Sequence, residues 1–323
     1  PLAHVQAPTA GSVLLAGVLL KIGTYGFIRF SIPLLPEATG YFVPLLLWIS
    51  VAGIIYGALV ALAQSDMKRL IAYSSVSHLG FCMLGLFALN RLGVQGSVLQ
   101  MINHGISTGG LFAIIGMLYE RYHTRRIADL RGLAGKIPLI ALFMVIFTLS
   151  SIGLPGLNGF AGELLILVGA FQRAGPWNSL ELTQFKLIAI LALSGVVLGA
   201  WYMLWLVQRV FFGQLKEPAQ EHEVGDIKPR EIGALVPLVV LAIWIGVQPQ
   251  FFLQRMAPTL DKITDHSQPQ IRISQINRAG EVAREGEAPA EPQSIDSRRA
   301  GKIDGHARPS HKERTKEKLA RVR

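Results

Sequence analysis

Seven long apolar stretches occupy most of this 323-residue chain, and each is near the length of a membrane-spanning helix. They run roughly over residues 9–30, 41–63, 69–89, 95–119, 138–172, 184–212 and 231–254. An α-helix needs about 20 consecutive apolar residues to cross a bilayer, whereas a helix on a soluble core carries a polar stripe. The stretches are apolar on all sides, so the sequence predicts an all-α polytopic membrane protein with about seven transmembrane helices.

The fifth stretch, residues 138–172, is too long for one straight span and is interrupted in its middle. Residues 150–159 contain three glycines, an asparagine and Pro155, which together weaken or break a helix. Non-helical backbone at bilayer depth persists only where protein or a water-filled cavity satisfies it, and such discontinuous helices mark ion or substrate sites in transporters. The pattern favours a discontinuous helix near Pro155; a short turn outside the membrane is the alternative.

The charge is concentrated at the C-terminal end of the chain. Residues 255–323 hold 15 of the 31 Lys and Arg residues, although only 16% of the whole chain is charged. We therefore predict a transmembrane domain over 1–257 and a polar, disordered tail over 258–323, with a short helical pattern at 312–322. The basic tail lacks the aromatic or helix-turn-helix context of nucleic-acid binding. The single cysteine, Cys82, excludes an intrachain disulfide and a thiolate metal cluster.

Lysine and arginine divide unequally between the two sets of predicted loops. One set carries eleven, namely Lys68, Arg69, Arg121, Arg125, Arg126, Arg131, Lys136, Arg209, Lys216, Lys228 and Arg230. The opposite set carries four, namely Arg29, Arg91, Arg173 and Lys186. Because cytoplasmic loops are enriched in these residues, we predict the first set and the chain start on the cytoplasmic side. The opening Pro1-Leu2-Ala3 has no Met and no signal-peptide n-region, so we expect the chain to begin inside a larger protein.

Lys21 and Glu163 are isolated charges inside apolar stretches. A lysine at the centre of a transmembrane helix costs about 2.5–3.5 kcal/mol, and a desolvated lysine can exchange protons near neutral pH. Glu163 follows the predicted break and could hold a cation or exchange protons. The alternatives are a structural ion pair for Lys21 and, for Glu163, a carboxylate favoured by a helix N-terminus.

Two histidines, His78 and His104, lie in successive apolar stretches, each beside hydroxyl or amide side chains. Histidine is the side chain best suited to relay protons near pH 7, and a buried interhelical hydrogen bond is the alternative role. Metal binding is disfavoured because neither histidine has a second ligand three or four residues away. His4 lies too near the chain start to interpret alone, and His123, among loop arginines, is expected to be solvated.

Four runs of residues give the chain a resemblance to a known family. They are Ala3–Gly26, Asp66–His78, Met101–Gly105 and Gly153–Glu163. Over about residues 1–254 the chain resembles the subunit M (mitochondrial chain 4) family of proton-pumping NADH:quinone oxidoreductase, respiratory complex I. Related L-type and N-type subunits share the second run more loosely, and L-type chains would have a lysine where this chain has Glu163.

The resemblance implies roles for four residues. Lys21 is similar to the lysine that links two half-channels, and His78 and His104 to the histidines that continue the hydrophilic axis. Glu163 is similar to the terminal residue that exchanges protons with the far side. The family also has a Glu–Lys pair on earlier helices, which would precede Pro1, so we expect transport only within a full-length subunit of the complex.

The implied function is a proton-translocating membrane subunit of a bacterial plasma membrane. The chain itself is expected to bind no cofactor; NADH, FMN, iron–sulfur clusters and quinone are implied in partner subunits. The L-type and N-type antiporter-like subunits are implied as its partners in the membrane. Alternatives are a subunit of a multisubunit Na⁺/H⁺ antiporter, a subunit of a membrane-bound hydrogenase, or a non-catalytic relic with a structural role.

Overall fold

The computed structural model describes residues 1–175, 184–218 and 224–264. All of them lie in one compact unit, Pro1–Ala279, and the second unit, Gly280–Arg323, lies outside the described residues. The expected disorder beyond residue 264 and the helical pattern at 312–322 therefore also fall outside them. Within the described ranges the regular elements are helices, accompanied by two isolated β-bridges and no strand.

Eleven labelled α-helices and two π-helical turns build this unit. The α-helices are α1 (Leu2–Gln6), α2 (Thr9–Leu14), α3 (Lys21–Gly26), α4 (Ile32–Leu34), α5 (Pro36–Leu62), α6 (Met67–Phe87), α7 (Arg91–Tyr122), α8 (Pro138–Ser151), α9 (Asn158–Ala174), α10 (Gln184–Phe211) and α11 (Pro229–Val247). The π-helical turns η1 (Leu15–Leu19) and η2 (Phe27–Ser31) join α2, α3 and α4 into one apolar run.

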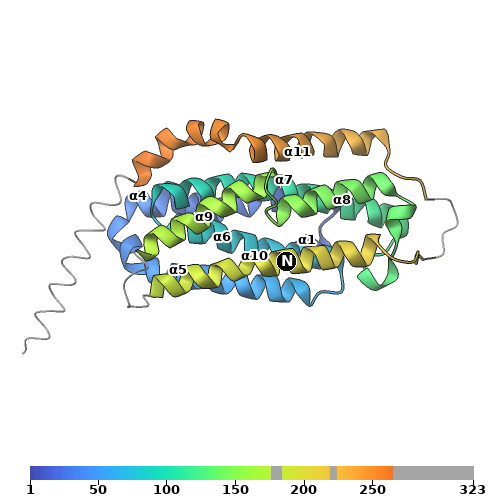
Figure 1. Cartoon of the computed structure of the whole chain (residues 1–323), viewed down its shortest axis with the longest axis horizontal. Coiled ribbons are helices and arrows are strands. Elements are labelled where there is room, and N and C mark those ends of the chain that lie inside the picture. Colours follow the sequence, from blue (N-terminus) through green and yellow to red (C-terminus); the bar gives the residue numbers. More distant parts are fainter. Residues whose placement is uncertain (176–183, 219–223, 265–323) are drawn as a thin grey trace, which may run out of the picture. The chain divides into compact units, whose positions relative to one another are not determined.

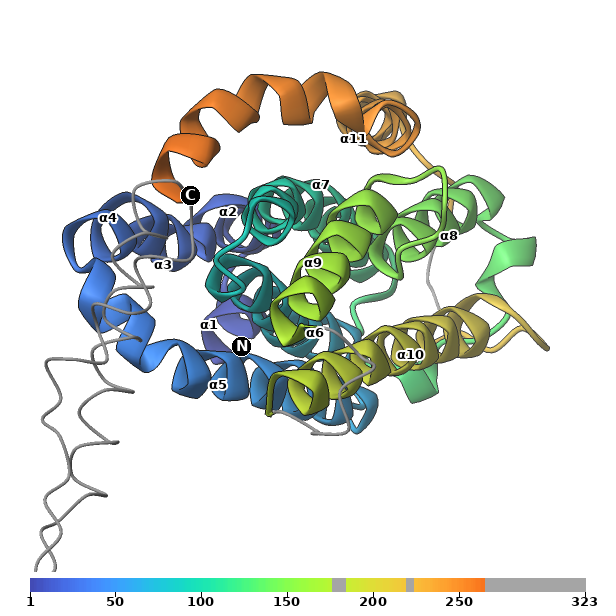
Figure 2. The same cartoon turned by 60° about the vertical axis from the view of Figure 1, so that its left-hand side comes forward.

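The helices run side by side along one direction, as a membrane-spanning bundle requires (Figure 1). Six runs in the described residues are long and apolar enough to cross a membrane, and α8 is a shorter apolar helix. Together with the broken pair α8–α9, they confirm the prediction of about seven transmembrane segments. The most buried of the six are α6 and α7, which Figure 2 shows surrounded by the other helices.

Prolines set several helix boundaries. Leu35, Ile137 and Gln248 each precede a proline and have backbone angles outside the helical region. The ring of a following proline disfavours the α conformation, while proline itself fits the first turn of the next helix. The next helices accordingly start at Pro36, at Pro138 and after Gln248.

Side-chain caps begin the two central helices. The Asp66 carboxylate accepts the backbone N–H of Arg69 at 3.0 Å at the start of α6, and the Asn90 side chain accepts that of Gly93 at 2.9 Å at the start of α7. Each cap satisfies a backbone donor that has no partner inside the helix.

The predicted break separates α8 from α9 and lies at mid-length of α7. The α8 N-terminus is held at the end of α7 near Tyr122, because the backbone N–H of Leu139 donates to Asp226, whose carbonyl accepts from Arg121. Near the other end of α7, Asn90 donates to the carbonyl of Gly169 on α9 at 2.7 Å. The two short helices therefore share the length of one spanning helix, and the alternative of a turn outside the membrane is excluded.

The last apolar stretch differs from the expected single span over 231–254. Helix α11 ends at Val247, and a second helix runs over 249–264. Figure 2 shows this segment (orange) crossing over the bundle from α11 toward α4. Leu260 and Thr264 are buried, so the domain boundary expected at 258 falls inside a packed helix.

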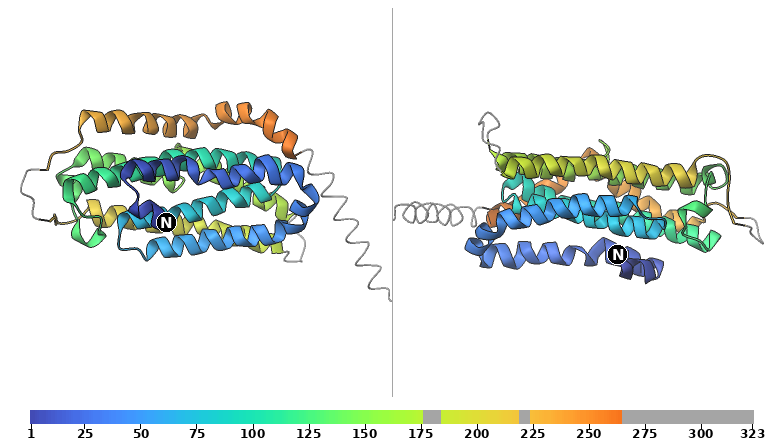
Figure 3. Two further views of the ribbon diagram at one scale, coloured as in Figure 1. Left: turned by 180° about the vertical axis from the view of Figure 1, so that it is seen from behind. Right: turned by 90° about the horizontal axis from the view of Figure 1, so that it is seen from below.

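The first apolar run lies along α7. Its segments α2 and η1 pack directly on that helix, as seen from behind in Figure 3. The run brings Lys21 beside the buried centre of the bundle.

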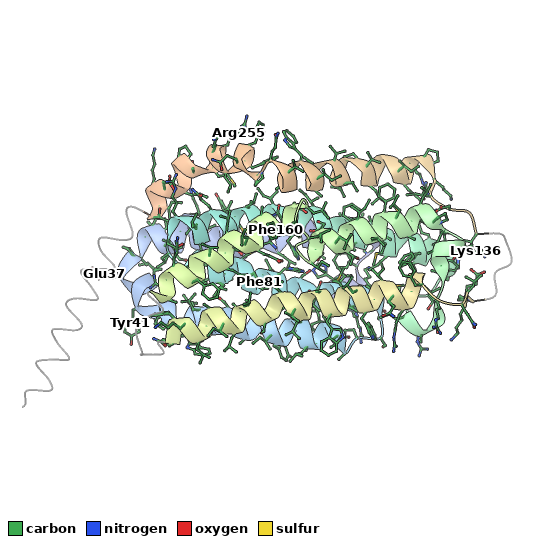
Figure 4. The ribbon with its side chains drawn as sticks, in the orientation of Figure 1. Glu37, Tyr41, Phe81, Lys136, Phe160 and Arg255 are labelled. Carbon is green, nitrogen blue, oxygen red and sulfur yellow. The ribbon has the colours of Figure 1, made fainter. Side chains whose placement is uncertain are left out.

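The loops rich in Lys and Arg meet at one end of the bundle. The β-bridges Asp66–Arg126 and Arg131–Lys216 tie three of these loops together. Figure 4 shows Lys136 at this end and Glu37 at the opposite end. One member of the opposite set, Lys186, lies buried inside α10 rather than in a loop. The side of the membrane on which the basic end lies stays a prediction.

Candidate functional site

Lys21 begins α3, separated by one residue from the π-helical turn η1, and this turn provides a backbone acceptor for its side chain. In η1 the backbone N–H of Leu20 donates to the carbonyl of Leu15, five residues back, at 3.1 Å. The Lys21 ammonium group donates to the carbonyl of Ala16, also five residues back. Single π-turns are frequent at functional sites, and this one supplies a backbone acceptor for a charge inside an apolar helix.

The second partner of the Lys21 ammonium group is His104 on α7. The Nζ atom lies 2.9 Å from Nδ1 of His104, and the histidine is 3% exposed. Its other ring nitrogen, Nε2, is buried without a hydrogen-bond partner. A neutral imidazole accepts at one nitrogen and donates at the other, so this ring can receive a proton from Lys21 and offer one farther on.

His78 on α6 is the next titratable group. Its ring centroid lies 5.5 Å from that of His104, with the rings tilted by 54°. On the opposite side, Nδ1 of His78 lies 3.6 Å from a carboxylate oxygen of Glu163 on α9. The three groups come from three helices and are all at most 6% exposed.

The Glu163 carboxylate is placed by the break and by a neighbouring amide. Gln100, one turn before His104 on α7, donates to Oε1 of Glu163 at 3.1 Å. Gly153 in the break has φ of 74°, and a side chain there would meet Oε2 of Glu163 at 2.7 Å. Both the left-handed conformation and the close approach require glycine.

Two asparagines fasten the break to α7. The Asn103 side chain donates to the carbonyl of Asn158 at 2.7 Å, and the Asn158 side chain donates back to the carbonyl of Asn103 at 3.2 Å. The hydroxyl of Ser150, at the end of α8, donates to the Asn158 amide oxygen. Buried backbone groups must be paired, so this reciprocal pair satisfies the interrupted backbone at the centre of the bundle.

Two hydroxyl groups approach the outer edge of the His78 ring. Ser151, the last residue of α8, places Oγ 3.2 Å from Nε2, and Tyr202 on α10 places Oη 3.4 Å from the same nitrogen. Neither residue stood out in the sequence, because a serine at a helix end and a tyrosine in an apolar span are common. Gln100, Asn103 and Asn158 were also missed, although Asn103 and Asn158 lie within the runs that carry the family resemblance.

The structure places all four predicted residues in one continuous cluster. Their spatial order is Lys21, His104, His78, Glu163, so the two histidines stand in the reverse of their order along the chain. Figure 4 shows the flanking residues Phe81 and Phe160 near mid-length of the helices, far from Lys136 and Glu37 at the ends.

The remaining sequence candidates lie away from this cluster or play structural parts. His4 is buried and stacks on Phe112, with ring centroids 5.3 Å apart. His123 is exposed and caps α7 with a positive φ. Cys82 is a buried free thiol.

Fold and cluster together define a polytopic helical membrane protein with a row of titratable side chains at mid-length of its helices. The model of the NADH:quinone oxidoreductase/Mrp antiporter transmembrane family matches residues 1–191. The chain therefore belongs to this family.

Relatives and a solved structure agree with that placement. The chain is 47% identical to NADH-ubiquinone oxidoreductase chain 4 of Marchantia polymorpha, over 82% of this chain and 51% of the relative. It is 45% identical to NADH-quinone oxidoreductase subunit M of Rhodobacter capsulatus, over 80% of this chain and 48% of the relative. A chain of respiratory complex I from Thermus thermophilus superposes with a TM-score of 0.72 at 34% identity, covering 80% of this chain and 52% of that one. The chain thus spans about half the length of the relatives it matches.

Proposed function

We propose that this chain forms part of a proton-translocating membrane subunit of an NADH:quinone oxidoreductase. In such a complex, electron transfer from NADH to quinone is coupled to proton transport across the membrane. The observation that carries the proposal is the row from Lys21 to Glu163, in which four titratable side chains from four helical segments adjoin one another. His104, His78 and Glu163 are at most 6% exposed, and Lys21 is half-buried. The names of the relatives support the same reading.

The geometry supports a role for each member of the row. Lys21 can pass a proton to Nδ1 of His104 across 2.9 Å. The two imidazole rings can carry it onward, with water bridging any separation too long for a direct hydrogen bond. Glu163 receives it from Nδ1 of His78 and exchanges it toward the far side. Movement of charge nearby would drive each step by changing proton affinities.

Redox chemistry is assigned to partners of this chain. We infer that NADH, FMN, iron–sulfur clusters and quinone are bound by other subunits, and that L-type and N-type antiporter-like subunits adjoin this one in the membrane. We place the complex in a bacterial plasma membrane. Cell fractionation, followed by detection of the chain with subunits that bind those groups, tests both assignments.

Removal of the charge at either end of the row tests the function. We expect Lys21→Ala or Glu163→Gln, made in the assembled complex, to abolish proton transport by this subunit and so to lower the number of protons moved per electron. Assembly and NADH oxidation report whether the complex is intact. Glu37→Gln is the matched control, because Glu37 is an exposed glutamate at the end of the bundle. A normal proton-to-electron ratio in either variant of the row would overturn the proposal.

An Na⁺/H⁺ antiporter subunit is the second candidate, because the matched family also includes Mrp antiporters. Transport measured in sealed vesicles separates the two functions. Proton movement driven by an imposed Na⁺ gradient, without NADH, would favour the antiporter.

A further inference from the structure

The His78 imidazole has different partners at its two ring nitrogens. Nδ1 faces only the Glu163 carboxylate, at 3.6 Å, and makes no hydrogen bond. Nε2 faces the hydroxyl groups of Ser151 and Tyr202, at 3.2 and 3.4 Å. These partners come from α8, α9 and α10, so three helices meet at this one ring on α6.

The charges of these partners determine where the ring proton is favoured. A carboxylate only accepts hydrogen bonds, whereas a hydroxyl group both donates and accepts. A proton on Nδ1 therefore points at the negative Glu163, and Nε2 is then left to accept from the two hydroxyl groups. With the proton on Nε2 instead, the lone pair of Nδ1 would face the negative carboxylate, which is unfavourable in a buried site.

We propose that Ser151 and Tyr202 are positioning residues that hold His78 with its proton on Nδ1, the nitrogen that delivers it to Glu163. This inference rests on the proposed function of the row. Transfer proceeds when Nε2 accepts a proton that His104 passes on, directly or through a bridging water or hydroxyl group, and Nδ1 releases its own proton to the Glu163 carboxylate. The ring is then neutral with its proton on Nε2, and the hydroxyl donors favour its return to the Nδ1-protonated form.

The two hydroxyl groups reach His78 because of where Ser151 and Tyr202 lie in their helices. Ser151 is the last residue of α8 and so reaches His78 only because the helix breaks directly after it. Tyr202 is 1% exposed and lies in the middle of α10. Any shift of α8 or α10 against α6 would change the donors at Nε2 and thereby the proton position at Nδ1.

Nitrogen-15 NMR of histidine measures the proton position directly. The full chain is labelled at histidine in its membrane assembly, and the His78 signals are identified by their absence in His78→Asn. We expect His78 to be protonated at Nδ1. In the double variant Tyr202→Phe with Ser151→Ala, we expect the ratio of the two tautomers to shift by about tenfold toward the Nε2-protonated form, which corresponds to about 1.4 kcal/mol.

Conservative variants separate positioning from packing. Ser151→Thr, combined with Tyr202→Phe, retains one hydroxyl group and should restore part of the original ratio. Tyr122→Phe and Ser12→Ala are controls, because each removes a hydroxyl group from a buried residue outside the cluster. If the double variant does not accumulate in the membrane, the His78 tautomer ratio is measured in the two single variants instead. Unchanged His78 signals in the Tyr202 and Ser151 variants, or an equal change in the controls, would overturn the inference.

Measurements of proton transport in the variants distinguish the positioning role of Ser151 and Tyr202 from the proposed function of the row. We expect the double variant to transport protons several-fold more slowly, and Ser151→Thr to recover part of the rate. If Lys21→Ala and Glu163→Gln transport normally while the His78 signals shift, the proposed function fails and the positioning role stands. If those variants abolish transport while the His78 signals are unchanged, only the positioning role fails.

Discussion

Among the described residues, the Lys21 ammonium group has two partners, the backbone carbonyl of Ala16 in the π-helical turn η1 and Nδ1 of His104. A charge inside a spanning helix is tolerated only when such partners replace water. Neither partner is an acid, so the structural ion pair considered from the sequence is not what the structure shows. The arrangement leaves the lysine close to a group that can accept its proton.

Asn103 offers a test at the level of single residues. Its side chain donates both to the Asn158 carbonyl and to the Gln100 amide oxygen, and it is fully buried. Asn103→Leu would leave these acceptors unpaired, at about 1–3 kcal/mol for a buried polar group. We expect a lower midpoint of thermal unfolding in detergent and slower proton transport.

The control for Asn103 is a polar residue on the surface of a helix. Gln208→Leu changes an exposed side chain of α10 and should leave the unfolding midpoint close to that of the unmodified chain. Equal midpoints in the two variants would show that the amide pair does not hold the break.

Among the elements, the broken pair α8–α9 contributes most to the site. The interruption ends α8 at Ser151 beside His78 and starts α9 so that Glu163 reaches the same histidine. A continuous helix would place its side chains at helical spacing and could not present both groups to one ring. The break is therefore the structural condition for the cluster.

Glycine substitutions test the break. A side chain at Gly159 would approach the carbonyl oxygen of Ser150 to 2.0 Å, whereas one at Gly23 would meet nothing within 4 Å. We expect Gly159→Ala to separate α8 from α9 and to lower both stability and transport. Gly23→Ala should be neutral or stabilising, because alanine has the higher helix propensity by about 1 kcal/mol. Thermal unfolding of the two variants measures the difference, and similar losses in both would argue against a strained break.

Over the whole unit, ion pairs of unequal burial fasten its two ends. At the basic end, Arg121 of α7 binds Glu231 of α11 through two hydrogen bonds of 3.1 and 2.7 Å, and both side chains are less than 10% exposed. At the other end, Arg91 pairs with Asp261 of the last described helix at 3.1 Å, with Arg91 largely exposed. Both pairs attach the C-terminal helices to α7, the helix that carries His104.

The difference in burial predicts a difference in stability. Arg121→Ala leaves a buried carboxylate without its partner, which costs about 3–5 kcal/mol. Arg91→Ala removes a pair of the solvent-exposed kind, worth about 0–1 kcal/mol. The free energy of unfolding, measured by chemical unfolding in detergent, should therefore be much lower for Arg121→Ala than for Arg91→Ala. The reverse ranking would show that the last helix, rather than α11, fastens the bundle.

The four site residues stand out in the sequence because charge and histidine are costly inside a bilayer, and the family resemblance ordered them by role. Apolar length located the spans, and helix-breaking residues located the break near Pro155, since both depend on local composition. The start of a second helix after Gln248 was missed, because the expected span was extended through Gln248, Pro249 and Gln250 to the apolar residues that follow.

The sequence by itself determined that this chain crosses a membrane with isolated ionisable groups in its spans, because hydrophobic length and local helix breakers are properties of neighbouring residues. Only the tertiary structure decided that His104 stands between Lys21 and His78, and that Ser151 and Tyr202 meet at one ring nitrogen. These contacts join residues 26–124 positions apart. Helix packing fixes such distances, and no local pattern records which faces of two apolar helices meet.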